Sequence, residues 1–348
     1  MSRDFFKRSD VKRLLIRSTN WIGDAVMTTP AVRAIRRHFP GASISLLAKP
    51  WVAPVFANSP HVDEIIVYEA NGRHRGAMGP IRLARDLRRR DFDAAILLQN
   101  AIEAALIAFL AGIPMRVGFD TDARRLLLTH PVRCTKAIKA IHQTGYYLKI
   151  LEGVGIPPRG QILELSVGDT NRQRAKEILT EQGALPGRRV IGLNPSATFG
   201  PAKQWFPERF AVLGDRLSRT LDAAIVIFGG PADRDLGNHI AGMMQAPVVD
   251  LSGRTSLGEA MALIERCDAF VTNDSGLMHV AAAVNTPLVA VFGSTNSTTT
   301  SPFSSTSRIV RVPIECSPCM KPVCPLGHMN CMRQVSVEVV AEAVEGLL

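Results

Sequence analysis

The stretch AFVTNDSGLMHVAAA, residues 269–283, determines how this chain folds. Its first residues are apolar or β-branched, which is typical of a strand buried in a parallel sheet. The residues from Asn273 to Ser275 then favour a turn, and Gly276 opens a run of small residues that predicts a helix. A buried strand followed at once by a helix is the repeating unit of an open α/β sheet.

The same alternation extends in both directions along the chain, so the predicted fold class is α/β. Strands are expected at 13–18, 43–48, 64–68, 94–98, 189–194, 223–229, 269–273 and 287–293. Helices are expected at 25–39, 80–90, 101–111, 170–182, 207–219, 233–244, 256–267 and 276–284. The Ser- and Thr-rich stretch 294–307 is expected to be a loop.

A chain of 348 residues is too long for one ordinary domain and suits two. The proline- and glycine-rich segment 157–169 reads as a linker, which predicts one Rossmann-like domain over 1–165 and a second over 166–348. The C-terminal helix could pack back on the first domain. Because ligands of such sheets bind beyond the carboxyl ends of the strands, the turns after strands are the candidate sites.

Charge is distributed unevenly between the two halves. Residues 1–165 hold 25 Lys and Arg against 14 Asp and Glu, whereas residues 166–348 hold 16 against 17. The basic half favours an acidic partner such as a nucleic acid, an anionic lipid or an acidic glycan, although a solvated basic surface accounts for it equally well. No apolar run reaches the roughly 18 residues of a spanning helix, and the N-terminus lacks an apolar signal core. These features predict a cytoplasmic protein and leave peripheral membrane contact open.

The first strand-to-helix turn contains Gly23 and Asp24. Asp24 is either an N-cap of the following helix or a general base that takes a proton from an attacking hydroxyl. The turn lacks the G-x-G-x-x-G fingerprint of dinucleotide-binding domains, which disfavours a dehydrogenase.

Turns in the second half offer groups for a phosphorylated ligand. Lys203 follows a strand in a Gly- and Pro-rich loop and suits a phosphate, while Ser196 and Thr198 supply hydroxyls. Asp233, after the next strand, either accepts bonds from ribose hydroxyls or caps a helix.

The strand-to-helix segment 269–283 supplies the remaining candidates. Backbone N–H groups of Ser275, Gly276 and Leu277, at a helix start, are predicted to bind a diphosphate beside Asp274. His279 lies one helical turn after Ser275 on the same side, although a lone histidine is more often structural.

Three motifs together resemble glycosyltransferase family 9, the ADP-heptose:lipopolysaccharide heptosyltransferases, and most of all its heptosyltransferase II branch. They are NWIGDA at 20–25, FGPAKQW at 199–205 and TNDSGLMHVAAA at 272–283. The resemblance covers nearly the whole chain and implies a GT-B fold, in which two Rossmann-like domains face each other across a cleft. It also implies inverting transfer of L-glycero-D-manno-heptose from ADP-heptose, with no metal or other cofactor, onto the first heptose of the lipopolysaccharide inner core.

The resemblance implies roles for particular residues. Asp24 matches the general base, and Lys203 matches a lysine that contacts the donor phosphates. Asp274 and the following Ser275-Gly276-Leu277 match the donor-binding segment, which also contains His279. Asp233 lies near an acidic residue that binds adenosine, but the alignment there is loose.

The implied acceptor, a heptosyl-Kdo2-lipid A, is acidic and would explain why the first half of the chain is basic. Its phosphates and carboxylates would place the enzyme peripherally on the cytoplasmic face of the inner membrane. The basic candidates are Arg82, Arg85, Arg88, Arg89, Arg90, Lys136 and Lys139, although the spacing from 82 to 90 also fits an ordinary exposed helix face.

Cys316, Cys319, Cys324 and Cys331, with His328 among them, have the character of metal ligands, and reduced thiols are the alternative. Three other functions remain as alternatives to heptosyltransferase II: heptosyltransferase I or III, or a GT-B enzyme with another nucleotide-sugar. A non-catalytic basic protein that binds nucleic acid is disfavoured, because the chain has only three Trp and three Tyr and its charge forms no recognition helix.

Overall fold

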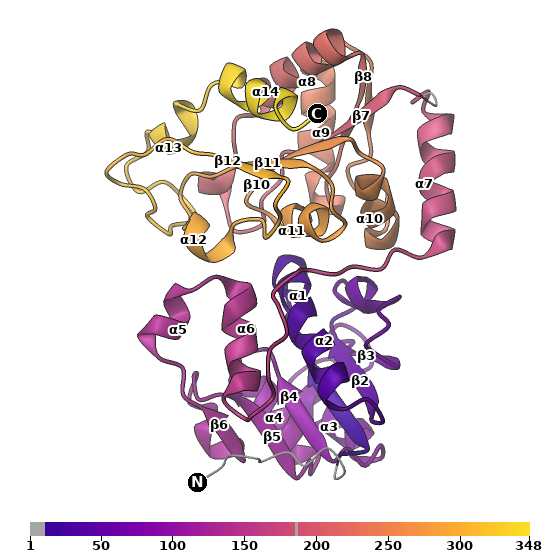
Figure 1. The fold of residues 1–348 in the computed structure, drawn as a ribbon, viewed down its shortest axis with the longest axis vertical. Coiled ribbons are helices and arrows are strands. Elements are labelled where there is room, and N and C mark those ends of the chain that lie inside the picture. The colour runs from indigo at the N-terminus through magenta and orange to yellow at the C-terminus, as the bar shows by residue number, and fades with distance from the viewer. Residues whose placement is uncertain (1–10, 185–186) are drawn as a thin grey trace. The chain divides into compact units, whose positions relative to one another are not determined.

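The computed structural model describes residues 11–184 and 187–348, and it divides into two compact units. The first unit ends at Ser166 and the second begins at Val167. Each unit is built around one six-stranded sheet in which every pairing is parallel (Figure 1).

The first unit has the strand order β3-β2-β1-β4-β5-β6. Its strands are β1 Arg13–Arg17, β2 Ser43–Ala48, β3 Glu64–Val67, β4 Ala94–Leu97, β5 Met115–Phe119 and β6 His130–Val132. Its helices are α1 Ile22–Met27, α2 Thr29–His38, α3 Gly79–Arg88, α4 Ile102–Leu110, α5 Lys136–Ala140 and α6 Gln143–Glu152, with short 3-10 turns η1 Ala53–Phe56 and η2 Arg124–Leu127.

The second unit has the order β12-β11-β10-β7-β8-β9. Its strands are β7 Arg189–Asn194, β8 Ala223–Ile227, β9 Val248–Asp250, β10 Ala269–Asn273, β11 Leu288–Val291 and β12 Ser307–Val310. Its helices are α7 Asp169–Glu181, α8 Pro207–Leu221, α9 Arg234–Met243, α10 Leu257–Glu265, α11 Gly276–Ala283, α12 Ser297–Thr300, α13 Asn330–Arg333 and α14 Val337–Glu345, with η3 Pro201–Lys203 and η4 Pro231–Asp233.

Both sheets have the doubly wound order, in which the chain builds outward from the centre in one direction and then in the other. The reversal falls between β1 and β4 in the first unit and between β7 and β10 in the second. At such a switch point the two neighbouring turns leave in opposite directions and open a crevice beyond the carboxyl ends of the strands. The topology therefore marks the turns after β1, β7 and β10 as the places for ligands.

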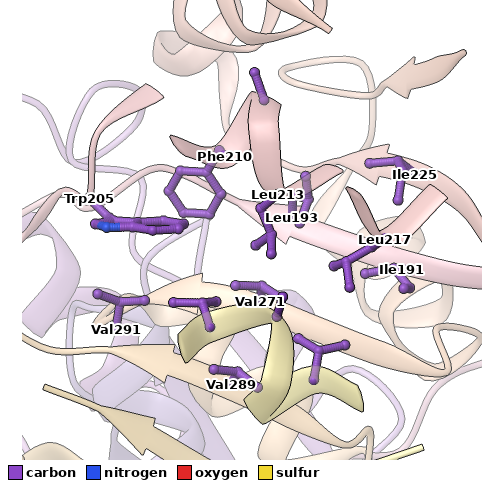
Figure 2. Packing of buried hydrophobic residues seen from close by; sticks show 14 of the residues in the cluster. Ile191, Leu193, Trp205, Phe210, Leu213, Leu217, Ile225, Val271, Val289 and Val291 are labelled. Carbon is purple, nitrogen blue, oxygen red and sulfur yellow. The ribbon is translucent and has the colours of Figure 1, made fainter. Parts of the chain in front are cut away.

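One large apolar cluster holds the second unit together and fixes its carboxyl edge. Figure 2 shows strand residues such as Ile191 and Val271 packing against Trp205, Phe210 and other side chains that lead into and form α8. Helix α14 buries its inner face in this same cluster and packs against α8, β11 and β12. Contact between this helix and the first unit stays a prediction.

The structure differs from the sequence prediction at several boundaries. The single helix expected at 25–39 is two helices, α1 and α2, which are separated at Thr28. Pro30 lies in the first turn of α2, where its missing N–H costs nothing, so it favours a new helix start. The expected loop at 294–307 contains the short helix α12. Among the described residues, no helix combines the length and apolar character that crossing a membrane requires.

Candidate functional site

The switch point of the second sheet is held together by buried asparagines that end its two central strands. Asn194 closes β7 and donates to Thr272 Oγ1 at 2.9 Å and to Ser275 Oγ at 2.6 Å. Asn273 closes β10 and donates to the carbonyl of Pro195 at 2.7 Å. Because each side chain reaches the other strand's turn, the two turns after β7 and β10 form one rigid unit.

Lys203 and Asp274 meet at this point. Lys203 Nζ lies 2.7 Å from Asp274 Oδ2, and the two side chains are only 15% and 5% exposed. The ammonium also donates to the Asp274 carbonyl at 3.4 Å, and Thr295 Oγ1 donates to Asp274 Oδ2 at 2.7 Å. An ammonium has three N–H donors, so these two acceptors leave one donor for a ligand.

The loop that carries Lys203 is fixed on both sides. Trp205 is buried, and its backbone N–H donates to Asn273 Oδ1 at 3.0 Å while its indole N–H donates to the Val335 carbonyl at 3.0 Å. At the other end, the Ala202 N–H donates to the Pro322 carbonyl at 3.0 Å. Gly200 has φ of 152°, and a Cβ there would lie 2.4 Å from that same carbonyl oxygen. Only glycine lets the two loops approach this closely.

Ser196 and Asp233 also come together. Ser196 Oγ donates to Asp233 Oδ1 at 2.7 Å, and the Gly230 N–H donates to Asp233 Oδ2 at 2.7 Å. Asp233 occupies the N-cap position of α9, as the sequence allowed, but its side chain makes no capping hydrogen bond there. The carboxylate instead closes its own turn η4 and faces the turn after β7. Thr198, in that turn, is exposed.

Helix α11 begins beside this arrangement. Ser275 occupies its N-cap position without a side-chain cap, since its hydroxyl is bonded to Asn194 instead. Gly276 and Leu277 are half-buried residues in the first turn, whose N–H groups carry the positive end of the helix dipole. His279 is buried within the helix's inner side, so a direct contact with a ligand stays a prediction.

Asp24 lies in the first unit, in the turn after β1. Helix α1 starts at Ile22 with Trp21 as its N-cap, so Asp24 is inside the first turn and the N-cap alternative is wrong. The buried Tyr147, from α6, is hydrogen-bonded to Asp24. Burial first, and then the Asp24 charge, raise the pKa of Tyr147 well above its usual value. Tyr147 therefore stays protonated and donates its hydroxyl to the carboxylate.

Sequence reasoning missed a cationic cluster at the same edge of the first sheet. Arg17 is buried and donates to Asn20 Oδ1 at 2.9 Å and to the Ser18 carbonyl at 2.6 Å. Lys49 Nζ lies 3.4 Å from the centre of the Tyr68 ring. Burial lowers the pKa of Arg17 to about 10, so the guanidinium stays charged at neutral pH. The sequence signal that could have found this cluster is a charged residue directly at the end of a buried strand, as at Arg17 and Lys49.

The cysteines at 316–331 lie next to the lysine loop. All six cysteines of the chain are free thiols, and Cys316, Cys319, Cys324 and Cys331 line one small cavity of about 20 Å³ together with His328. Backbone N–H groups, that of Met329 first, lower the pKa of Cys324. Within residues 11–184 and 187–348 no group of three His, Cys, Asp or Glu side chains has a metal-binding arrangement. Metal binding by these cysteines stays a prediction.

Comparison with known proteins assigns the chain to a family. The family model for glycosyltransferase family 9 (heptosyltransferase) matches residues 81–330. Lipopolysaccharide heptosyltransferase 2 of Escherichia coli K12 is 33% identical over 86% of this chain and 88% of its own length. Lipooligosaccharide heptosyltransferase 2 of Haemophilus influenzae is 33% identical over the same shares.

A solved structure agrees with these matches. That of ADP-heptose lps heptosyltransferase II from E. coli has a TM-score of 0.82 and 30% identity, and the match covers 96% of this chain and 98% of that one. The match confirms the GT-B fold class and the assignment as a glycosyltransferase. The chain belongs to glycosyltransferase family 9, the heptosyltransferases.

Proposed function

We propose that this enzyme transfers L-glycero-D-manno-heptose from ADP-heptose, with inversion, onto the first heptose of the lipopolysaccharide inner core. The observation that carries the proposal is the Lys203–Asp274 pair at the switch point of the second sheet, beside the start of α11. The names of the relatives support both the donor and the second-heptose step. Heptosyltransferases I and III and other nucleotide-sugar transferases are the alternatives.

The second unit binds the donor in this proposal. Negative charge grows on the leaving ADP as the glycosidic bond breaks, and the electron pair of that bond departs with the diphosphate. The ammonium of Lys203 and the N–H groups of Ser275, Gly276 and Leu277 stabilise that charge. Asp274 is an unsuitable phosphate ligand, and its role is to orient Lys203 and to contact the donor sugar.

The adenosine end of the donor lies towards Asp233. Its carboxylate oxygens already accept bonds from Ser196 and Gly230, so a ribose hydroxyl would join or displace the Ser196 hydroxyl. Thr198 contributes a further hydroxyl from the same loop. His279 supports the start of α11 from the buried side.

The first unit binds the acceptor. A hydroxyl of the acceptor attacks the anomeric carbon of the donor from the side opposite ADP, and Asp24 takes the hydroxyl proton as the new bond forms. Tyr147, which is hydrogen-bonded to Asp24, orients the carboxylate. A single displacement of this kind inverts the anomeric centre, and its transition state has oxocarbenium character. No group beyond these side chains and the two substrates is required.

The acceptor is a heptosyl-Kdo2-lipid A, whose phosphates and carboxylates suit a basic unit. Lys49 and Arg17 provide positive charge at the carboxyl edge of the first sheet. Lys136 and Lys139, on α5, add positive charge after β6. The arginines of α3 instead run towards the amino edge of the sheet, where Arg90 pairs with Glu64 at the start of β3, so they are not assigned to acceptor binding. The enzyme thus works in the cytoplasm, in peripheral contact with the inner membrane, and has no nucleic-acid partner.

The experiment that tests the donor and the base uses the purified enzyme with ADP-heptose and other nucleotide-sugars. ADP-heptose should be the preferred donor, and Asp24→Asn should lower kcat by about two orders of magnitude or more while ADP affinity is kept. Preference for another nucleotide-sugar would reject the donor. Full activity of Asp24→Asn would remove Asp24 from the mechanism.

A further inference from the structure

The outer face of α4 is apolar although it is exposed. Ile102, Leu106, Phe109 and Leu110 are 46%, 38%, 48% and 37% exposed. Their spacing places them on one side of the helix, while the opposite side, which includes Ala105 and Ala108, is buried against the sheet. A helix on the surface of a soluble domain normally has polar residues on its outer face. Four large apolar side chains there indicate a surface that is covered in use.

A neighbouring turn extends this surface. Leu126, in η2, is 93% exposed, and η2 packs directly against α4. The turn is rigid because Arg124 is buried and donates to the Phe119 carbonyl at 2.7 Å and to Asn100 Oδ1 at 2.9 Å. Asp122 Oδ2 accepts the Ile102 N–H at 2.9 Å and so joins the turn to the start of α4. The structure therefore holds Leu126 outward by specific bonds.

Arginines surround the apolar surface. Arg116 places its guanidinium 5.4 Å from the centre of the Phe109 ring, and the Arg88 guanidinium lies beside Gly112, just after α4. Arg125 is exposed next to Leu126. Of the basic residues predicted on α3, Arg90 is paired with Glu64 at 2.6 Å. By contrast, no ion pair among the described residues involves Arg85, Arg88 or Arg89.

Helices α3 and α4 present their outer faces on the same side of the first unit. They pack against each other, and both bury their inner faces in one cluster with strand residues such as Leu15 and Leu97. The exposed side of α3, which carries Ile81, Arg85 and Arg89, therefore continues the surface of α4. We call the combined surface of α3, α4 and η2 the α4 face.

We propose that the α4 face docks on the surface of an anionic lipid bilayer. An apolar centre with a basic surround matches a membrane interface, where the apolar side chains enter the acyl boundary and the arginines bind lipid phosphates. A second copy of the chain is a less suitable occupant, because a twofold contact would bring two sets of arginines together. The inference rests on the proposed function in one respect: docking would hold the enzyme next to a lipid-anchored acceptor.

Vesicle flotation tests the proposal without any need for activity. The full chain should float with phosphatidylethanolamine–phosphatidylglycerol vesicles and much less with phosphatidylcholine vesicles. Phe109→Ser and Leu126→Ser should each weaken binding by about tenfold, since each removes a large buried apolar group in the bound state. Arg85→Glu should weaken binding to the anionic vesicles by about tenfold at low salt. At high salt the charges are screened, so this variant and the original protein should bind to the same extent.

Matched variants in the second unit serve as controls. Val212→Ser removes an exposed apolar side chain from α8, and Arg219→Glu reverses an exposed charge there. Both should float like the original protein. Each variant is also assayed on an acceptor oligosaccharide without lipid A, where transfer should be unchanged.

The outcomes separate the docking surface from the proposed function. Flotation that is unaffected by Phe109→Ser, Leu126→Ser and Arg85→Glu would overturn docking through the α4 face, whatever the transfer assay shows. A dimer in solution that Phe109→Ser abolishes, without any vesicle binding by the original protein, would assign the face to a second copy and also overturn it. If the original protein floats, the variants of the α4 face float less, and no heptose is transferred from ADP-heptose, the proposed function is refuted while docking through the α4 face stands.

Discussion

Replacing Lys203 by methionine tests the donor site where the structure is most specific. The substitution keeps the length of the side chain and removes its charge. It leaves the Asp274 carboxylate, 5% exposed, with the Thr295 hydroxyl as its one side-chain donor within the part of the chain that the structure describes. Breaking a fully buried ion pair costs roughly 3–5 kcal/mol. Because Lys203 keeps some exposure, we expect about 2 kcal/mol of lost stability.

Donor affinity should fall by a similar amount. A charge-assisted hydrogen bond to a phosphate contributes about 1.5–3 kcal/mol, which corresponds to roughly a 10- to 150-fold rise in the Kd for ADP. The unpaired carboxylate of Asp274 then repels the diphosphate as well. Asp274→Asn in the same chain removes that repulsion and the buried charge. The double variant Lys203→Met/Asp274→Asn should therefore be more stable, and should bind ADP more tightly, than Lys203→Met alone.

ADP binding is measured by calorimetric titration, and stability by unfolding in urea. Both are measured on the original protein, the two single variants and the double variant. The comparison gives one coupling energy for ADP binding and one for stability. We expect a coupling of at least about 1 kcal/mol in stability. Strict additivity would show that the two side chains do not interact as the structure has them. An unchanged ADP affinity in Lys203→Met would exclude the ammonium from the donor site.

Four further predictions concern other parts of the site. Tyr147→Phe removes the hydroxyl donated to Asp24, so kcat/KM should fall with ADP affinity kept; an unchanged kcat/KM would show that Tyr147 does not act on the base. The same variant has a stability consequence, since the raised pKa of Tyr147 means that ionisation is disfavoured in the native state: unfolding free energy should fall as pH rises above about 10 in the original protein and fall less in Tyr147→Phe, as measured by urea unfolding. Gly200→Ala places a Cβ 2.4 Å from the Pro322 carbonyl, which should displace the Lys203 loop, lower kcat/KM by more than about tenfold and cost about 1–3 kcal/mol; kinetics and stability like those of the original protein would contradict the loop contact. Chelation with EDTA should leave the initial rate of transfer unchanged, because protein groups alone stabilise the leaving diphosphate in the proposed mechanism; a loss that Mg²⁺ restores would contradict it.

The sequence predicts the architecture well where one strand and one helix follow each other directly. The stretch from Ala269 to Ala283 forms β10 and α11 with the expected turn between them. The edge strands β6, β9 and β12 were missed, since each has only three or four residues, and β5 was missed because Arg116 and Gly118 interrupt its apolar run. The break at Thr28 was missed because the apolar periodicity continues across it. Local patterns therefore identify central elements, while short elements depend on their neighbours in the sheet.

The sequence proposes candidate residues one by one, and it does not show which of them lie together. Lys203 and Asp274 are 71 residues apart, and nothing in the spacing shows that they pair directly. Tyr147 has no motif, and only the fold brings it to Asp24. Asp24 was open to an N-cap role because the start of a helix moves by one or two residues without any clear sequence signal, and α1 in fact starts at Ile22. Pairing between distant residues is set by topology, which local sequence encodes weakly.

The central claim is the transfer of heptose from ADP-heptose onto an inner core that already carries one heptose. The direct measurement presents the purified enzyme with ADP-heptose and with lipopolysaccharide acceptors truncated after no, one or two heptoses, and follows the products by mass spectrometry. We expect one heptose to be added to the one-heptose acceptor, in step with the release of ADP, at a much higher rate than to the other two. Preferred transfer to the acceptor without heptose, or to the one with two, would assign the enzyme to a different step and contradict the account.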